Sequence, residues 1–275
     1  MQALSTHSVT SHVNDWLAKS RRPRILHIFD SVCNLINEHR QVLSIVTPEI
    51  GNGPFSLVVE NRVFFSDHLS LQSPISISQS KLTTGDLIIQ TANAKLWKPT
   101  PDWKRLHALR ERIAGQLLQL PLPTDSPLLP QPLVSSLSLA LVHKDLLSTQ
   151  KVTSKLAGLG AGLTPAGDDF IMGAIHAVWI IHPPEVASAL TQAIANTAAP
   201  LTTSLSGAWL RFAAKGEAGI LWHQFFEALV GRVANATYLH ETMDNILSVG
   251  ETSGADALAG FSNTLTAWAT SSSRK

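Results

Sequence analysis

The hydrophobic pattern of this chain changes its period once, near residue 97, and that change limits the folds it can adopt. Up to about residue 95, short runs rich in β-branched and aromatic residues alternate with Pro, Gly, Asn and Thr, which is typical of strands. After "LWKPTPDW" the apolar residues recur at helical spacing, as in "DWKRLHALRERIAGQLLQL". Strands first and helices second predict an α+β protein.

The strand-like part holds six runs, which are "RILHIF", "QVLSIV", "FSLVVE", "RVFFSD", "ISISQS" and "DLIIQT". Several of them alternate between apolar and polar residues, so we expect a small antiparallel sheet or a barrel-like sheet. Two of the runs are nearly continuous in "FSLVVENRVFFSD", which reads as a hairpin turning at Glu60 and Asn61.

The helical part begins with a helix from about residue 102, which the segment "PLPTDSPLLPQP" ends. We place the main break of the chain in this proline-rich segment. The organisation we expect is a β-rich domain over 1–100, a helix with a proline-rich connector over 101–132, and a helical domain over 133–275. Further helices are predicted over 133–148, 165–181, 184–199, 202–215, 217–231, 237–248 and 253–270.

Composition excludes several classes of function. The 275 residues carry 21 Lys and Arg against 20 Asp and Glu, and we see no basic stripe that would bind a nucleic acid. The longest apolar run, 170–181, is shorter than the roughly 20 residues that cross a bilayer, so we expect no membrane segment. The single cysteine, Cys33, has no internal disulfide partner, and no secretory signal begins the chain; both fit the cytoplasm.

The stretch "GLGAGLTPAGDDFIMG", residues 158–173, is the first candidate site. Thr164 before Pro165 predicts a helix start, with the threonine hydroxyl as cap and the proline at the first helical position. Gly160 and Gly162 then lie in the preceding loop, where their N–H groups could converge on an anion at the positive end of the helix. The glycines therefore favour a site for phosphate or another anionic ligand.

Two aspartates, Asp168 and Asp169, stand in the first turn of that helix. Carboxylates there would repel a bare phosphate, but they suit a divalent metal, an amide donor or proton transfer. A structural interpretation competes, because acidic residues in a first turn stabilise a helix by about 0.3–1 kcal/mol. The adjacent pair, preceded by loop glycines, favours a functional role.

A second motif repeats the pattern of the first. Both 167–173 and 254–260 read Gly-x-Asp-x-x-x-Gly, and each opens an apolar stretch. We therefore expect the two motifs to line one pocket, with Asp169 and Asp256 facing it. The alternative for the second motif is a capping box, in which Ser253 and Asp256 only stabilise the start of a helix.

With both motifs in view, the chain resembles the AllH-like family, on "GLGAGLTPAGDDFIMG", "GETSGADALAG", "TTSLSGAWLRFAAKGE" and "GNGPFSLVVE". The resemblance implies a subunit of oxamate carbamoyltransferase that works beside two other subunits in allantoin breakdown. The implied reaction moves a carbamoyl group between oxalurate and phosphate, giving oxamate and carbamoyl phosphate. The implied substrates are thus a small anionic molecule and phosphate.

The motif positions define the candidate site. As catalytic residues we expect Asp168, Asp169 and Asp256. As residues binding substrate or phosphate we expect Gly160, Gly162, Thr164, Gly167, Thr252, Ser253, Gly254, Ser206 and Arg211. Arg211 would pair with a carboxylate or phosphate, although a surface arginine is the simpler interpretation. Ala166 and Glu251 depart from the family pattern, where serine and histidine are common, so substrate or activity differs if those groups take part in the chemistry.

Two other functions fit the same residues. One is a metal-assisted hydrolase or transferase, with the three aspartates as oxygen ligands of magnesium or manganese. The other is a non-catalytic subunit that docks its partners on helix faces rich in glycine and alanine.

Overall fold

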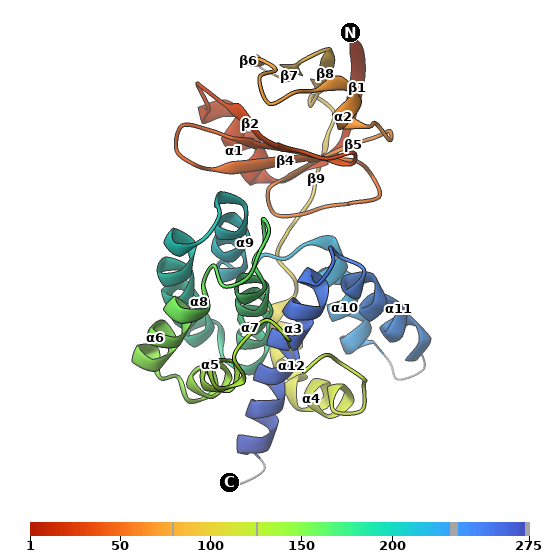
Figure 1. The fold of residues 1–275 in the computed structure, drawn as a ribbon. Helices are drawn as coiled ribbons and strands as arrows, with labels where there is room; N and C mark the ends of the chain where they lie inside the picture. Colours follow the sequence, from red (N-terminus) through yellow and green to blue (C-terminus); the bar gives the residue numbers. More distant parts are fainter. Residues whose placement is uncertain (79, 125, 232–235, 273–275) are drawn as a thin grey trace. The chain divides into compact units, whose positions relative to one another are not determined.

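The computed structural model describes residues 1–78, 80–124, 126–231 and 236–272, and they form two compact units. The first unit is Met1–Pro99 and the second is Thr100–Lys275. The strands lie in the first unit together with two helices, and the second unit is helical (Figure 1). The predicted α+β class, with strands first, is confirmed.

The first unit is a barrel-like mixed sheet with the strand order β2-β3-β4-β5-β1-β8-β7-β6, and β9 pairs with β1. Its strands are β1 (Gln2–Val9), β2 (Arg24–Ile28), β3 (Val32–Ile36), β4 (Val42–Val46), β5 (Ser56–Val59), β6 (Ile75–Ser78), β7 (Lys81–Thr84), β8 (Leu87–Gln90) and β9 (Lys95–Leu96). The sheet is not antiparallel throughout, because β4 runs parallel to β5, and β1 runs parallel to β8 and β9.

The predicted hairpin of 55–67 is wrong. Only β5 forms there, and the chain then enters the short helix α2 (Phe65–His68). The run "RVFFSD" leaves the sheet because Phe65 is fully buried in the core of this unit, beside Val63 at 5% exposure. The strand partners of β5 are instead β1 and β4.

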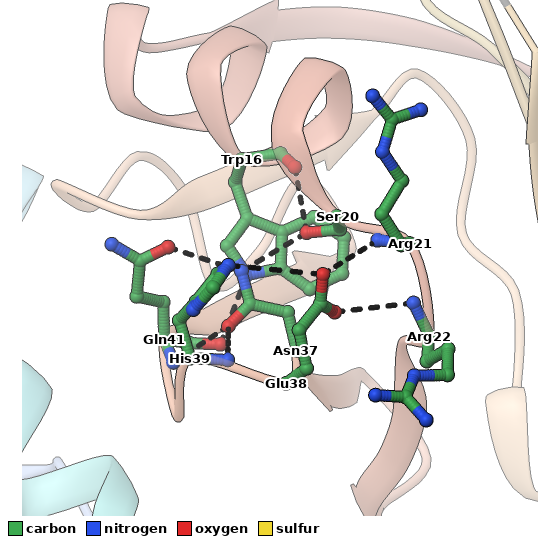
Figure 2. A network of polar contacts seen from close by, with 8 residues as sticks. All are labelled: Trp16, Ser20, Arg21, Arg22, Asn37, Glu38, His39 and Gln41. Carbon is green, nitrogen blue, oxygen red and sulfur yellow. Dashed lines mark hydrogen bonds and ion pairs between the residues drawn. The ribbon is translucent and has the colours of Figure 1, made fainter.

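A polar network joins the helix α1 (Ser11–Lys19) to the turn between β3 and β4 (Figure 2). The Asn37 side chain accepts from the backbone N–H groups of His39 and Gln41 and donates to Ser20 Oγ. Trp16 Nε1 donates to the Gln41 carbonyl at 2.9 Å. The network satisfies buried polar groups, as a turn under a helix requires.

The same network fixes the two arginines that follow α1. The Glu38 carboxylate accepts from the backbone N–H groups of Arg21 and Arg22, at 2.9 and 3.1 Å (Figure 2). A hydrogen bond from its own backbone N–H, together with these two bonds, lowers the pKa of Glu38. Glu38 therefore binds the backbone of this basic pair.

The second unit is helical. Its helices are α3 (Trp103–Ala108), α4 (Arg110–Leu117), α5 (Gln131–His143), α6 (Leu146–Leu156), α7 (Ala166–Ile181), α8 (Pro184–Ala198), the 3-10 helix η1 (Ala199–Leu201), α9 (Ser204–Ala214), α10 (Ile220–Val230), α11 (Ala236–Leu247) and α12 (Ser253–Ser272). The predicted helix over 133–148 is two helices, α5 and α6, because Lys144 adopts a left-handed conformation with φ 60° that ends α5.

Helix α7 lies at the centre of the second unit and packs along α12 (Figure 1). All of its residues except Met172 are buried, which explains the nearly continuous apolar sequence. That run is a core helix: within the described residues, no helix has the length and apolar character needed to cross a membrane.

Candidate functional site

The loop before α7 folds back on the start of that helix. Gly158, Gly160 and Gly162 have φ values of 72°, 115° and 90°, which are left-handed conformations that glycine adopts without strain. A Cβ on Gly160 would lie 2.8 Å from the Ala166 nitrogen, so a side chain at this position has no room. Gly160 and Gly162 are exposed. These glycines shape an exposed loop in front of α7.

The predicted cap of α7 is wrong in its detail. The helix begins at Ala166 and its N-cap is Pro165, without a side-chain cap bond. The Thr164 hydroxyl instead lies 2.9 Å from the Ser253 hydroxyl, at the first residue of α12. The two glycine–aspartate motifs therefore lie together at the N-terminal ends of α7 and α12.

Glycines let α7 and α12 approach until their backbones touch. A Cβ on Gly173 would lie 1.7 Å from the Ala257 carbonyl oxygen, and one on Gly260 would lie 1.9 Å from the Phe170 carbonyl oxygen. The last glycine of each motif thus packs against the carbonyl of the residue that follows the aspartate in the other motif. The two helices run side by side in the same direction.

The first glycine of each motif has an equivalent role. A Cβ on Gly167 would lie 2.0 Å from the Leu156 carbonyl oxygen at the end of α6, and one on Gly254 would lie 1.8 Å from the Ile246 carbonyl oxygen near the end of α11. Both glycines therefore allow the preceding helix to pack closely, and this packing explains why glycine stands at positions 167 and 254.

Asp169 and Asp256 are buried at 5% and 2% exposure. In each, Oδ2 is buried without a hydrogen-bond partner among the described residues. Burial is the main cause that raises the pKa of Asp169 to about 8; repulsion from Asp256 and Asp168 adds to it, and hydrogen bonds from Ser253 and Thr164 oppose it. Asp169 therefore holds a proton at neutral pH.

Asp256 does not form the capping box that the sequence offers as an alternative. Its Oδ1 accepts a 2.5 Å hydrogen bond from the Ser126 hydroxyl. Ser126 comes from the proline-rich connector and is 1% exposed. Sequence reasoning missed this residue, because a serine in a segment without periodicity carries no signal of its partner.

Asp168 has a different environment from Asp169. Its Oδ1 accepts from the Gly158 N–H at 2.9 Å, and its Oδ2 accepts from the hydroxyls of Ser206, at 2.9 Å, and Thr202. Burial raises the pKa of Asp168, and these three bonds lower it. Asp168 therefore ties the glycine loop to the start of α9, and it brings Ser206 to the site.

Arg211 and Thr252 lie apart from these buried groups. Arg211 is exposed in the last turn of α9, and its guanidinium lies near Gly207 of the same helix. Thr252 is exposed just before α12, and its carbonyl accepts from the Asp256 N–H at 2.9 Å. No described hydrogen bond or ion pair joins either side chain to an aspartate.

A second buried titratable group lies further along α7. His176 is 1% exposed, and its Nδ1 has no hydrogen-bond partner among the described residues. Its ring lies 4.8 Å from that of Trp222 and 6.1 Å from that of Trp103, centroid to centroid. Burial lowers the pKa of His176 to about 3, so this histidine is neutral over the physiological range.

The metal alternative depends on a set of ligands. Across the described ranges, no three His, Cys, Asp or Glu side chains are grouped so that they could hold a metal ion. Asp168, Asp169 and Asp256 are accordingly not arranged as such a set.

Two family models match the chain. The AllH family N-terminal domain matches residues 2–96, and the oxamate carbamoyltransferase subunit AllH matches residues 156–265. The second match includes the glycine loop, both glycine–aspartate motifs, α7 and most of α12. No solved structure matches the chain.

Proposed function

Because the chain belongs to the AllH family, named for a subunit of oxamate carbamoyltransferase, we propose that it works in a multi-subunit enzyme that moves a carbamoyl group between oxalurate and phosphate. The products are oxamate and carbamoyl phosphate, in the breakdown of allantoin in the cytoplasm. Two other subunits complete the enzyme.

The reaction needs a proton at a defined place. A phosphate oxygen attacks the carbamoyl carbon of oxalurate, and the bond from that carbon to the oxamate nitrogen breaks. The leaving nitrogen takes up a proton to become the amide of oxamate, and the attacking hydrogen phosphate gives up its own proton. A group that holds a proton at neutral pH and can exchange it with both partners supports this exchange.

Asp169 is the residue that we assign to this task. Its carboxyl is protonated at neutral pH because it is buried and because Asp256 and Asp168 repel a second negative charge. It gives its proton to the leaving nitrogen and regains one from phosphate. Repulsion from Asp256 and Asp168 disfavours the ionised form of Asp169 and so favours its reprotonation by phosphate.

The glycine loop supplies the anion site in this proposal. Gly160 and Gly162 are exposed and adopt left-handed conformations in the loop before the 16-residue helix α7. The N–H groups of Gly167, Asp168 and Asp169 already donate to the Leu159 and Pro165 carbonyls, so in this proposal the loop and the dipole of α7 attract the phosphate. A neutral Asp169 removes the repulsion that an ionised carboxylate would exert on that anion.

The observation that carries the proposal is the buried pair Asp169 and Asp256, each with an unpartnered oxygen, where the two motifs meet within the matched segment. Glycine packing explains much of both motifs, but it does not explain two acids that are buried without full hydrogen bonding. Such groups are costly to the folded state.

The test is carbamoyl phosphate formation from oxalurate and phosphate by the reconstituted subunits. We expect Asp169→Asn to lower turnover on the order of a hundredfold, since it removes the proton that is transferred. Asp244→Asn, an exposed aspartate of α11, is the matched control and keeps full turnover. Full turnover of Asp169→Asn would leave a docking role for the chain, and loss of turnover on chelation would favour metal assistance.

A further inference from the structure

The glycine loop, residues 158–165, is fixed at its start. The Gly158 N–H donates to Asp168 Oδ1 at 2.9 Å, and the Gly167 N–H donates to the Leu159 carbonyl at 2.8 Å. Gly158 also packs on η1, because a Cβ there would lie 2.7 Å from a carbonyl oxygen of that helix. The first two residues of the loop are therefore held by α7 and by the segment before α9.

The second half of the loop has one backbone anchor. Thr203 Oγ1 donates to the Leu163 carbonyl at 2.6 Å. Among the described residues, this carbonyl is the only backbone group of positions 160–164 that has a hydrogen-bond partner. The Thr164 hydroxyl bonds to Ser253, but that bond joins two side chains. The backbone here is thus tied to the rest of the unit by the Thr203 hydroxyl.

The tip of the loop, residues 160–162, needs such an anchor. The tip is exposed, and both of its glycines have positive φ values. A Cβ on Gly162 would have no atom within 4 Å. Glycine without neighbours can adopt many backbone conformations, so a defined tip requires a fixed residue on each side. Leu159 and Leu163 are those residues.

The donor to Leu163 is itself held by a helix. Thr203 is the N-cap of the 11-residue helix α9, and its hydroxyl oxygen accepts from the Ser206 N–H at 3.0 Å. A hydroxyl can accept and donate at the same time, and here its proton goes to Leu163. One side chain therefore caps α9 and joins the start of that helix to the loop.

We propose that Thr203 is a positioning residue, which holds the tip of the glycine loop in the conformation that binds phosphate. The binding of phosphate rests on the proposed function, whereas the ordering of the tip by Thr203 does not. Thr203 acts through Leu163 and needs no contact with phosphate. If the tip without this bond is in the binding conformation about a tenth of the time, its apparent affinity for phosphate falls about tenfold.

The ordering is tested by NMR relaxation of the backbone amides in the folded full chain. The order parameters of Gly160 and Gly162 should be about 0.85, as in rigid backbone, in the wild type, and below about 0.6 in Thr203→Val. Thr203→Ser keeps the hydroxyl and should keep the tip rigid. Thr203→Asp keeps a cap acceptor but has no proton to donate, so its tip should be as mobile as that of Thr203→Val. Circular dichroism establishes that each variant is folded.

Thr10→Val is the matched control. Thr10 is the N-cap of α1, and its hydroxyl accepts from the Val13 N–H at 3.3 Å and donates to the Pro54 carbonyl at 2.7 Å. It therefore makes the same two kinds of bond as Thr203, in the first unit, and its loss should leave the tip rigid. A tip that stays rigid in Thr203→Val or Thr203→Asp, or that becomes equally mobile in Thr10→Val, overturns the inference.

The reconstituted enzyme gives the second arm of the test. Thr203→Val should raise the KM for phosphate about tenfold and leave kcat within about twofold, because it weakens the binding of phosphate and touches no reacting group. Thr203→Ser should restore the KM, and Thr10→Val should leave it unchanged. An unchanged KM beside a mobile tip would overturn the phosphate role of the loop. If the unmodified enzyme forms no carbamoyl phosphate, the proposed function fails, and the relaxation result still decides whether Thr203 orders the tip.

Discussion

Replacement of Asp169 by asparagine should abolish a fall in stability between about pH 6.5 and 8. The folded-state pKa of Asp169 is about 8, and an aspartate in an unfolded chain has a pKa of about 4. The folded state therefore binds the extra proton over this range, so the contribution of Asp169 to stability is complete below about pH 4 and is lost as pH rises towards 8. The Asn variant has no such proton to lose.

The size of the effect follows from that one proton. Stability changes by about 1.4 kcal/mol per pH unit while the states differ by one proton. From pH 6.5 to 8 this amounts to about 1.5–2 kcal/mol, which lowers the melting temperature by about 3–8 °C in a unit of this size. The titration of His176 acts in the opposite direction, because its folded-state pKa of about 3 makes stability rise with pH. That rise is nearly complete at about pH 6.5, which is the usual pKa of histidine in an unfolded chain.

The assay is thermal and urea unfolding of the full chain, followed by circular dichroism of the helices from pH 6.5 to 8. The wild-type chain should lose stability across this range and Asp169→Asn should be nearly flat. Asp244→Asn, at an exposed site in the same unit, should follow the wild type. An Asp169→Asn chain that loses as much stability as the wild type would refute the assignment of a proton to Asp169.

Three further predictions concern packing and hydrogen bonds. In urea unfolding, Gly173→Ala should lower the free energy of unfolding by about 1–3 kcal/mol, because the new Cβ meets a carbonyl of α12. Gly115 has open space around it, so Gly115→Ala should raise the free energy of unfolding by about 0.5–1 kcal/mol. Asp168→Asn should lower the free energy of unfolding by about 1–3 kcal/mol, because it weakens the three hydrogen bonds that the carboxylate accepts. Turnover per folded molecule should stay within about threefold, and a hundredfold loss in the carbamoyl phosphate assay would contradict this. Asn37→Ala should speed hydrogen exchange of the His39 and Gln41 amides about tenfold, because the side chain that accepts their hydrogen bonds is lost. Unchanged exchange would count against the network.

Periodicity predicted the helical unit well because its helices are amphipathic or apolar over many turns. The predicted starts near 165 and 253 lie within a residue of α7 and α12. The central strand β1 escaped prediction, because "QALSTHSV" places the polar residues Thr6 and Ser8 in buried positions. β1 is an interior strand between β5 and β8, a position in the sheet that no local pattern shows.

Part of the candidate site was predictable from the local sequence. The glycine–aspartate motifs are local signals, and their meeting at Thr164 and Ser253 follows from the pattern they share. The partners of each acid are not local. Ser126 reaches Asp256 across 130 positions, and Ser206 reaches Asp168 across 38. Only the packing of whole helices brings such pairs together.

The paired glycine contacts of α7 and α12 relate the two helices by an approximate two-fold rotation that carries one motif onto the other. Perfect symmetry would give both aspartates identical surroundings. The chain breaks it locally. Asp168 stands where the second motif has Ala255, and in the described part of the chain the Ser126 hydroxyl bonds to Asp256 and to neither aspartate of the first motif. A duplicated backbone arrangement can thus place two copies of one side chain among different hydrogen-bond donors, without moving either helix.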